Sequence, residues 1–368
     1  MEYQPQQLQQ TIQNAIQGLV GREQLAELII LSIVAKEHLL VIGPPGTAKS
    51  AVVRRIAKAV QGQYFEYLLG RFTEPTELFG AVDLKQLREG RVEIDTQGML
   101  PQADIVFLDE VFLGSTAILN TLLGILNERV FRKGHTQIET PLKVCIGASN
   151  SLPEDETLSA FADRFLIHLF VDSVSDNFIE DLLIGGWQSE HVNFDSNTIT
   201  LEQISALSNE LSKVKMDLVI PIFAEAIRLL RKNNIALSDR RVVKTLKLIA
   251  AAALLNGRKQ AKKQDLWPLF YVLPTQEYQK KGQVILKEFF AVSQNSQLFN
   301  AVEAASLQPL AREERLIFEA ETLLQLNPTN VERLNVESLL REIDANYSIE
   351  SISERLLTIR KQLVQLVS

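Results

Sequence analysis

The stretch with the clearest chemistry is a turn rich in glycine and proline, GPPGTAKS at residues 43–50. It follows an apolar run at 39–42 and leads into a helical pattern that opens with Lys49 and Ser50. In this layout the backbone N–H groups of the turn and the positive end of the helix both face a bound anion. The Lys49 ammonium is expected to reach the β- and γ-phosphates, and the Ser50 hydroxyl to ligate Mg²⁺. The sequence therefore predicts a phosphate-binding loop.

One position of this turn departs from the usual pattern G-x-x-x-x-G-K-[ST], because Ala48 stands where a glycine precedes the lysine. Alanine carries a Cβ atom, so it fits there only with a negative φ or with mild strain. On this stretch alone, an ordinary turn before a helix is the alternative interpretation.

Polar residues follow two further apolar runs. Asp109 and Glu110 come directly after Ile-Val-Phe-Leu at 105–108, and Asn150 follows the run at 144–148. Ligands of open α/β sheets bind at the carboxyl ends of the strands, where these residues would meet. Asp109 is expected to hold Mg²⁺, Glu110 to polarise the attacking water as general base, and Asn150 to orient that water without adding charge. Taken alone, an acidic strand end or an Asn in a turn is also common in structural positions.

Two arginine positions could stabilise the charge that develops in phosphoryl transfer. Arg164 follows a helical segment, and an arginine of this kind can act on the site of a neighbouring subunit. Its structural alternative is a salt bridge with Asp163 or Asp172. In the sequence LSDRRVVK, Arg240 or Arg241 begins a helix in the second half of the chain and could sense the γ-phosphate; an exposed charged first turn is the alternative.

Composition restricts the class of protein. The 368 residues carry a net charge of −7, one cysteine and four histidines scattered along the chain. The acidic balance gives no general attraction to nucleic acid or acidic membranes, and the histidine spacing predicts no metal cluster. No apolar run approaches the ~18 residues of a membrane-spanning helix, and the polar N-terminal stretch has no basic start. We therefore expect a cytoplasmic protein, and the acidic balance argues weakly against a nucleic-acid partner while leaving a local basic patch open.

The elements around these residues alternate between strand and helix from 39 to 170, which predicts a parallel sheet covered on both faces. The segment VDLKQLREGRVEID at 82–95 alternates around Glu89-Gly90 and predicts a hairpin, whereas 129–134 is expected to end a helix in a basic turn. After about 172 the pattern becomes helical. Near the end, an apolar stripe predicts packing on another helix, within the chain or on a partner; it consists of Ile352, Leu356, Ile359, Leu363 and Leu366.

The whole arrangement resembles the AAA+ ATPases, and within them the MoxR family and its RavA-like branch. Ala48 in place of the loop glycine is itself a trait of MoxR-like proteins. The resemblance covers residues 6 to about 270 and rests on these motifs: LVGREQ at 19–24, GPPGTAKS at 43–50, FTEPTELFG at 72–80, IVFLDEVF at 105–112, LLGILNERVFRKG at 122–134, GASN at 147–150, FADRF at 161–165 and LSDRR at 237–241.

The resemblance implies a role for each matching residue. Lys49 and Ser50 match Walker A, Asp109 and Glu110 match Walker B, Asn150 matches sensor 1, Arg164 matches the trans-acting arginine finger, and Arg240 matches the sensor 2 arginine. Ser50 and Asp109 would hold Mg²⁺, and Val20 and Gly21 would lie near the adenine. The residues expected to bind ATP or ADP are Val20, Gly21, Gly43, Pro44, Pro45, Gly46, Thr47, Ala48, Lys49, Ser50, Ala51 and Asp109.

The resemblance also implies an architecture. It predicts an α/β P-loop core of the AAA+ type with a parallel sheet at 1–172, an all-α lid at 173–274 and a C-terminal helical domain at 275–368. The expected hairpin at about 82–95 fits the helix-2 insert of this group. RavA-like proteins carry a further domain inserted among the C-terminal helices, whereas this chain has only about 90 helical residues there.

The resemblance further implies a hexameric ring that hydrolyses ATP between subunits and remodels or activates a client protein, often with a von Willebrand A domain protein as partner. Two other functions remain open. One is a nucleotide-gated scaffold with incidental turnover. The other is a DNA-associated AAA+ motor, for which Lys85, Arg88 and Arg91 of the insert could line a pore.

Overall fold

The computed structural model describes residues 5–134, 136–188, 198–307, 309–325, 330–347 and 352–367. Its centre is a five-stranded sheet in which every neighbouring pair is parallel. The strand order is β2-β3-β6-β1-β7, with β1 at Leu39–Ile42, β2 at Tyr64–Leu68, β3 at Ile105–Asp109, β6 at Val144–Ser149 and β7 at Ile167–Phe170. The predicted parallel sheet is thus confirmed, and its continuous apolar strands are those expected of a sheet buried on both faces.

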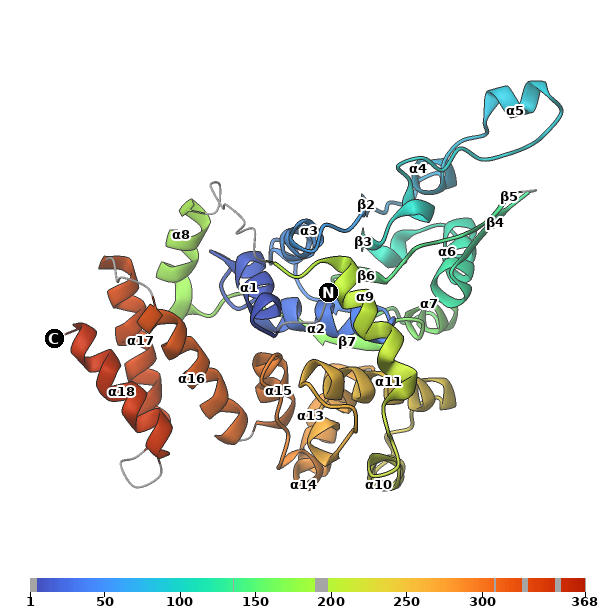
Figure 1. The fold of residues 1–368 in the computed structure, drawn as a ribbon. Coiled ribbons are helices and arrows are strands. Elements are labelled where there is room, and N and C mark those ends of the chain that lie inside the picture. Colours follow the sequence, from blue (N-terminus) through green and yellow to red (C-terminus); the bar gives the residue numbers. More distant parts are fainter. Residues whose placement is uncertain are drawn as a thin grey trace.

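Alternate side chains of each strand enter two separate apolar clusters. In β1, Leu39 and Val41 belong to one cluster, and Leu40 and Ile42 to the other. The first cluster includes side chains of α1 (Pro5–Ile16), α2 (Glu23–Ala35) and α3 (Lys49–Ala59). The second includes those of α6 (Thr116–Glu128) and α7 (Glu156–Ala162). Successive side chains of a strand point to opposite faces of the sheet, so both faces are covered by helices. The core therefore has three layers, with the sheet between two layers of helices (Figure 1).

The carboxyl ends of the central strands form one aligned edge. Ile42 is in register with Ser149 of β6 and with Phe170 of β7, and Leu108 of β3 is in register with Gly147. The Gly43 N–H also donates to the Ser149 carbonyl at 3.0 Å. This register brings the turn after β1, the acidic pair after β3 and Asn150 after β6 to the same edge of the sheet.

The insert after β2 differs from the predicted hairpin. A short helix, α4 (Pro75–Phe79), precedes it, and one antiparallel bridge joins Val82 to Ile94 at its base. Between them Leu84–Arg88 forms the helix α5, because the Asp83 side chain caps it by accepting from the N–H groups of Lys85 and Gln86. Figure 1 shows this arm projecting from the body. The hairpin predicted from the alternation of apolar and polar residues was wrong for the middle of this segment, because the Asp83 cap favours a helical turn there.

A paired hairpin does form, but elsewhere. The segment at 129–134, predicted to be a basic turn, contains β4 (Val130–Lys133), which pairs antiparallel with β5 (Thr136–Glu139). The preceding Arg129 takes a left-handed φ of 58° and ends α6, so the chain reverses there. The Phe131 side chain is buried and anchors this hairpin in the second apolar cluster.

The second half of the chain is helical, as predicted. The helices are α8 (Ile179–Gln188), α9 (Leu201–Glu210), α10 (Val219–Lys232), α11 (Asp239–Leu255), α12 (Pro268–Val272), α13 (Gln276–Ile285), α14 (Lys287–Phe290) and α15 (Phe299–Ser306). Helix α11 packs on α2, so the lid shares the first apolar cluster with the sheet. The fully buried Glu37, just before β1, forms ion pairs with Lys244 and with Lys247 of α11.

The last helices form a three-helix bundle with its own apolar cluster. They are α16 (Pro309–Gln325), α17 (Asn330–Asn346) and α18 (Glu354–Val367). The predicted stripe packs inside this bundle, because Leu356, Ile359 and Leu363 of α18 are buried against the other two helices. In the part of the chain that the structure describes, no helix is long and apolar enough to cross a membrane.

Candidate active site

The turn at 43–50 is an open loop between β1 and α3. Pro44, Pro45 and Gly46 are exposed, Gly46 has a φ of 76°, and no atom lies within 4 Å of the position that a Cβ atom would take there. Ala48 directly precedes α3 with φ 58° and ψ 24°. Its backbone is therefore left-handed, and not at the negative φ that an alanine prefers. The loop conformation costs roughly 1–2 kcal/mol at this residue.

Lys49 lies folded over the loop. Its Nζ donates to the Gly43 carbonyl at 2.7 Å and to the Pro44 carbonyl at 3.0 Å. Burial lowers the pKa of Lys49, while the neighbouring carboxylates of Asp109 and Glu110 oppose that shift. The structure thus brings together the ammonium and the acidic pair that the sequence predicted to share a site.

The acidic pair is held by its own backbone. Glu110 directly follows β3 in a left-handed conformation with φ 49° and ψ 45°, and its N–H donates to Asp109 Oδ1 at 3.0 Å. The two carboxylates accept from different donors although they are adjacent in sequence. The Asn150 amide, from the end of β6, donates from Nδ2 to Glu110 Oε1 at 2.7 Å. The predicted base and the predicted water-orienting amide are therefore in direct contact.

Arg22 is a buried member of the site that the sequence reasoning missed. Its Nε donates to the Thr47 carbonyl at 2.7 Å, and its guanidinium also donates to the carbonyls of Gly21 and Asp172, at 2.6 and 3.2 Å. Burial lowers the pKa of Arg22. The residue ties the Val20-Gly21 loop to the phosphate loop. The signal that could have found it is an arginine directly after the Val20-Gly21 turn in the motif LVGREQ.

Arg164 lies at the opposite edge of the sheet. It precedes β7, and about 20 Å of extended chain, at ~3.3 Å per residue, separates it from Phe170 beside the phosphate loop. In the described ranges, Arg164 forms no ion pair with Asp163 or Asp172, and its buried Nε has no hydrogen-bond partner. The predicted structural salt bridge is thus absent there, because Asp163 instead accepts from Arg241 Nη1 at 3.2 Å.

Arg240 and Arg241 have different surroundings. The sequence did not decide which of the two could sense the γ-phosphate. Arg241 is buried and donates to the carbonyls of Phe165, Leu166 and Val272, at 3.2, 2.8 and 2.8 Å. It therefore joins α11 to the chain before β7 and to the last residue of α12. Arg240 is half-buried, and its Nη2 donates to Asn127 Oδ1 at 2.6 Å.

The charge of Arg240 is close to that of Arg164. The pKa of Arg240 is lowered by burial and then by the neighbouring Arg164 guanidinium. Its buried Nε lacks a hydrogen-bond partner among the described residues, as the Arg164 Nε does. The structure therefore brings the two predicted arginines together, but away from the phosphate loop of their own chain.

The residues at the loop fit a nucleotide bound with Mg²⁺. The first N–H groups of α3 have no intrahelical acceptor and stand at its positive end, beside the exposed turn and the Lys49 ammonium. Ser50 and Asp109 are the oxygen donors that could hold the cation. In the described ranges there is no cluster of three or more His, Cys, Asp or Glu side chains suited to a metal. Mg²⁺ is commonly bound through one or two protein groups, and phosphate oxygens and water would complete its coordination.

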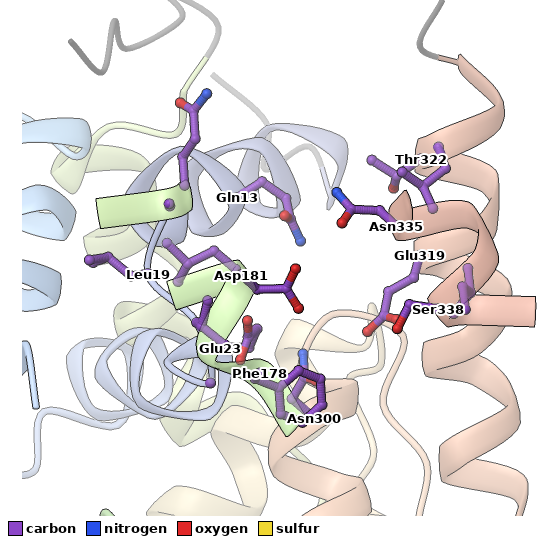
Figure 2. A pocket seen from close by; sticks show the side chains of 18 of the residues that line it. Gln13, Leu19, Glu23, Phe178, Asp181, Asn300, Glu319, Thr322, Asn335 and Ser338 are labelled. Carbon is purple, nitrogen blue, oxygen red and sulfur yellow. The ribbon is translucent and has the colours of Figure 1, made fainter. Parts of the chain in front are cut away.

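The remaining predicted contacts, Val20 and Gly21, lie beside the loop. They line a cavity of about 580 Å³ that is bounded by α1, α8 and the three-helix bundle (Figure 2). Arg22 lies between this cavity and Thr47, so the cavity and the phosphate loop are neighbours.

Comparisons with known proteins agree with this geometry. Residues 6–209 match the family described as the MoxR domain in the MoxR-vWA-beta-propeller ternary systems, and residues 199–285 match an AAA lid domain. A crystal structure from Cytophaga hutchinsonii superposes with a TM-score of 0.61 at 18% identity, over 79% of this chain and 95% of that one. At that identity it shows the fold alone.

Among the relatives, the protein MJ0079 from Methanocaldococcus jannaschii is 38% identical over 251 residues, which are 67% of this chain and 64% of that protein. The chaperone MoxR1 from Mycobacterium tuberculosis is 24% identical over 212 residues, 55% of each chain. The chain thus spans less than two thirds of these relatives. The match to the MoxR family covers residues 6–209, which are more than half of this chain, and the chain therefore belongs to the MoxR family of AAA+ ATPases.

Proposed function

We propose that this chain hydrolyses ATP to ADP and phosphate in the presence of Mg²⁺, at the sheet edge formed by the phosphate loop, Asp109, Glu110 and Asn150. The observation that carries the proposal is the 2.7 Å hydrogen bond from Asn150 to Glu110 beside Lys49. A carboxylate held by a neutral donor at the mouth of a phosphate loop is the arrangement that activates water for attack on a phosphoryl group.

Each side chain of the site has a proposed task. Glu110 accepts the proton of the attacking water, and Asn150 keeps the Glu110 carboxylate turned toward that water. Lys49 exchanges its two loop carbonyls for phosphate oxygens, which is a short movement of a flexible side chain. Mg²⁺, held by Ser50 and Asp109, would neutralise charge on the phosphates.

The arginine finger in this proposal comes from another subunit. Arg164 and Arg240 lie together at the edge of the sheet opposite to their own phosphate loop, and each has a buried Nε without a partner among the described residues. Two adjacent cations are costly unless an anion approaches them. We therefore propose a ring, as the family resemblance implies a hexamer, in which both arginines face the nucleotide of the neighbour.

A client protein and a protein partner are also part of the proposal. The matching family is described by systems that combine MoxR with a vWA and a beta-propeller protein, and the relative MoxR1 is named a chaperone. We propose a vWA-domain partner and a chaperone-like, cytoplasmic role. Membership of the RavA-like branch and the division into 1–172, 173–274 and 275–368 stay predictions.

The test is a measurement of ATP hydrolysis against protein concentration, with Arg164→Ala protein mixed into the wild type. If Arg164 acts in trans, the specific activity rises with concentration, and the variant depresses the activity of its wild-type neighbours. Arg341→Ala is the matched control, because Arg341 is an exposed arginine of α17 with one surface ion pair. Lys49→Ala and Glu110→Gln are expected to abolish turnover.

Specific activity that is independent of concentration, with a variant that is silent in mixtures, would place the complete site in one chain. Turnover by Lys49→Ala or Glu110→Gln at the wild-type rate would refute the site itself. The second candidate function, a nucleotide-gated scaffold, gains support if the ring forms with nucleotide but turnover stays slow and no client stimulates it.

A further inference from the structure

One side of the helix α8 is apolar and uncovered. The side chains of Ile179, Leu182, Leu183 and Trp187 are all exposed, and Trp187 is 87% exposed. Their spacing of three and four residues places them on the same side of the helix, here called the α8 outer face. Monomeric proteins rarely leave large side chains gathered in this way in water, so the α8 outer face has the character of an interaction surface.

The opposite side of α8 is fixed against the core. The backbones of Gly185 and Gly18 approach so closely that a Cβ atom on Gly185 would lie 2.7 Å from the Gly18 carbonyl oxygen. Ile184 and Asp181, near Gly185 on the helix, line the cavity beside the loop at 17–21. A rotation of α8 would break this contact between the two glycines, so the α8 outer face stays directed away from the body of its own chain.

The border of the α8 outer face is acidic. Four acids lie between residues 172 and 181, and no lysine, arginine or histidine occurs from 172 to 187. Asp176 and Glu180, at the start of the helix, are exposed. A surface that covers α8 therefore matches it best if its apolar side chains are accompanied by cations.

The arm at 81–95 presents such a surface. Its helix α5 has no buried residue, and Leu84 and Leu87 are exposed on one side of it. The segment at 84–91 carries three exposed cations, Lys85, Arg88 and Arg91, against a single acid. The arm therefore combines apolar side chains with a positive charge, which is the complement of α8.

The two surfaces lie far apart within one chain. Figure 1 shows α8 beside the C-terminal bundle at one end of the molecule and the arm at the other end, so the arm cannot cover the α8 of its own chain. Helix α7, which directly precedes the turn that holds Arg164, lies toward the end with the arm. A contact from the arm of one copy to α8 of the next therefore runs in the same direction as the proposed approach of Arg164 to a neighbour.

We propose that the arm of one subunit docks on the α8 outer face of a neighbouring copy of this chain, with Leu84 and Leu87 covering Trp187 and the cations of the arm facing the acids beside α8. The inference rests on the ring of the proposed function and assigns it a second contact. A head-to-tail contact of this kind repeats from copy to copy and closes a ring where the rotation allows it. The opposite charges guide the two surfaces together.

A cross-link between copies tests which surfaces meet. Leu87→Cys and Leu183→Cys place one exposed thiol on the arm and one on the α8 outer face, whereas Cys145, the single native cysteine, is buried. The two variants are mixed with Mg²⁺ and ADP and treated with a bifunctional maleimide. We expect a cross-linked dimer in the mixture and not in either variant alone. Val284→Cys, an exposed position of α13, replaces Leu183→Cys in the control and should give no dimer.

Sedimentation velocity measures the contribution of the contact to assembly. The double variant Leu84→Ser with Leu87→Ser removes the apolar side chains of the arm, and Leu183→Ser with Trp187→Ser removes those of α8. Each should raise the protein concentration at half-assembly about tenfold or more, whereas Val284→Ser should assemble like the wild type. A mixture of the two double variants retains one intact contact and should form dimers at concentrations where each alone is monomeric. Circular dichroism confirms that each variant folds.

Two results would overturn the inference and leave the proposed ring standing. They are equal cross-linking of Leu87→Cys to Leu183→Cys and to Val284→Cys, and an assembly that is unchanged in both double variants. A wild type that stays monomeric at every concentration would refute the ring as well. Arg164→Ala separates the two proposals, because it should lose hydrolysis in trans but keep the cross-link between the arm and α8.

Discussion

Asn150 Nδ2 donates to Glu110 Oε1 at 2.7 Å and so joins the carboxyl ends of β6 and β3. Glu110 also has a left-handed φ of 49°. A non-glycine residue in that region costs roughly 1–3 kcal/mol and persists where the surroundings hold it in place. Two constraints, one from the backbone and one from a side chain, therefore set the direction of one carboxylate. Asn150 is a positioning residue for that carboxylate in the proposed mechanism.

Substituting Asn150 is expected to separate turnover from nucleotide binding. Asn150→Ala removes the donor, and Asn150→Asp places a second carboxylate against Glu110, so we predict that kcat falls about 10²–10³-fold in both. ADP affinity, measured by calorimetry, should change less than about twofold because the Asn150 side chain bonds to Glu110 and, among the described residues, forms no hydrogen bond with the phosphate loop. Ser151→Ala is the control beside it. A kcat within about threefold of wild type for Asn150→Ala would contradict the role.

Ala48→Gly is expected to stabilise the protein. Ala48 has a φ of 58°, where a Cβ atom costs roughly 1–2 kcal/mol. Glycine removes that cost but adds freedom to the unfolded chain, worth roughly 0.4–1 kcal/mol. The free energy of unfolding should therefore rise by up to about 1.5 kcal/mol in urea titrations, whereas Ala48→Val should lower it. A loss of stability in Ala48→Gly would show that the loop adopts a different backbone in solution.

These residues show what the sequence could predict. The strands and the loop were predictable because apolar runs, a Gly/Pro turn and a following helix are local signals. The approach of Asn150 to Glu110 followed from chain order and the rule that parallel strands end at one edge. The sequence did not predict the sign of φ at Ala48, because an alanine can adopt a negative φ at no cost or a positive φ with mild strain. The pairing of Arg164 with Arg240 depends on how α11 docks on α2, which no local pattern encodes.

The same limit explains the insert. Alternation at 82–95 predicted a hairpin, but the Asp83 cap started α5 and left one bridge, Val82 to Ile94. In contrast, the strand β4 was not predicted, because the basic residues at 129–134 are typical of the end of a helix. Arg22 was missed because its partners are backbone carbonyls, which leave no trace in residue types.

Neighbouring arginines of α11 should respond differently to the same change. Arg241 is buried and donates to three carbonyls and to Asp163. Arg241→Lys loses the planar set of donors and leaves some of these buried acceptors without a hydrogen bond. We predict a fall in the free energy of unfolding of about 3 kcal/mol. Arg240 is only half-buried and its Nη2 donates to one side chain, Asn127, so Arg240→Lys should cost about 1 kcal/mol or less, but should lower ATP turnover.

Urea titrations of both variants and of the wild type make this comparison, with hydrolysis measured at equal protein concentrations. The pair serves as its own control, since both substitutions replace an arginine by a lysine in the first turn of one helix. Equal losses of stability would mean that Arg240 also holds the lid, and would remove the distinction on which its proposed catalytic role depends.

His168 is expected to make stability depend on pH. It lies buried in β7, its Nδ1 bonds to the Pro274 carbonyl at 2.8 Å, and burial lowers its pKa from 6.5 to about 3. The unfolded chain binds a proton below pH 6.5 while the folded chain does not, so this contribution is complete above pH 6.5 and is lost as the pH falls toward 3. His168→Gln keeps a donor but does not titrate. Between pH 7.5 and 5.0, we predict that urea titrations show the wild type losing about 2 kcal/mol more than His168→Gln, at about 1.4 kcal/mol per pH unit. Equal losses in the two proteins would mean that His168 is charged in the folded state.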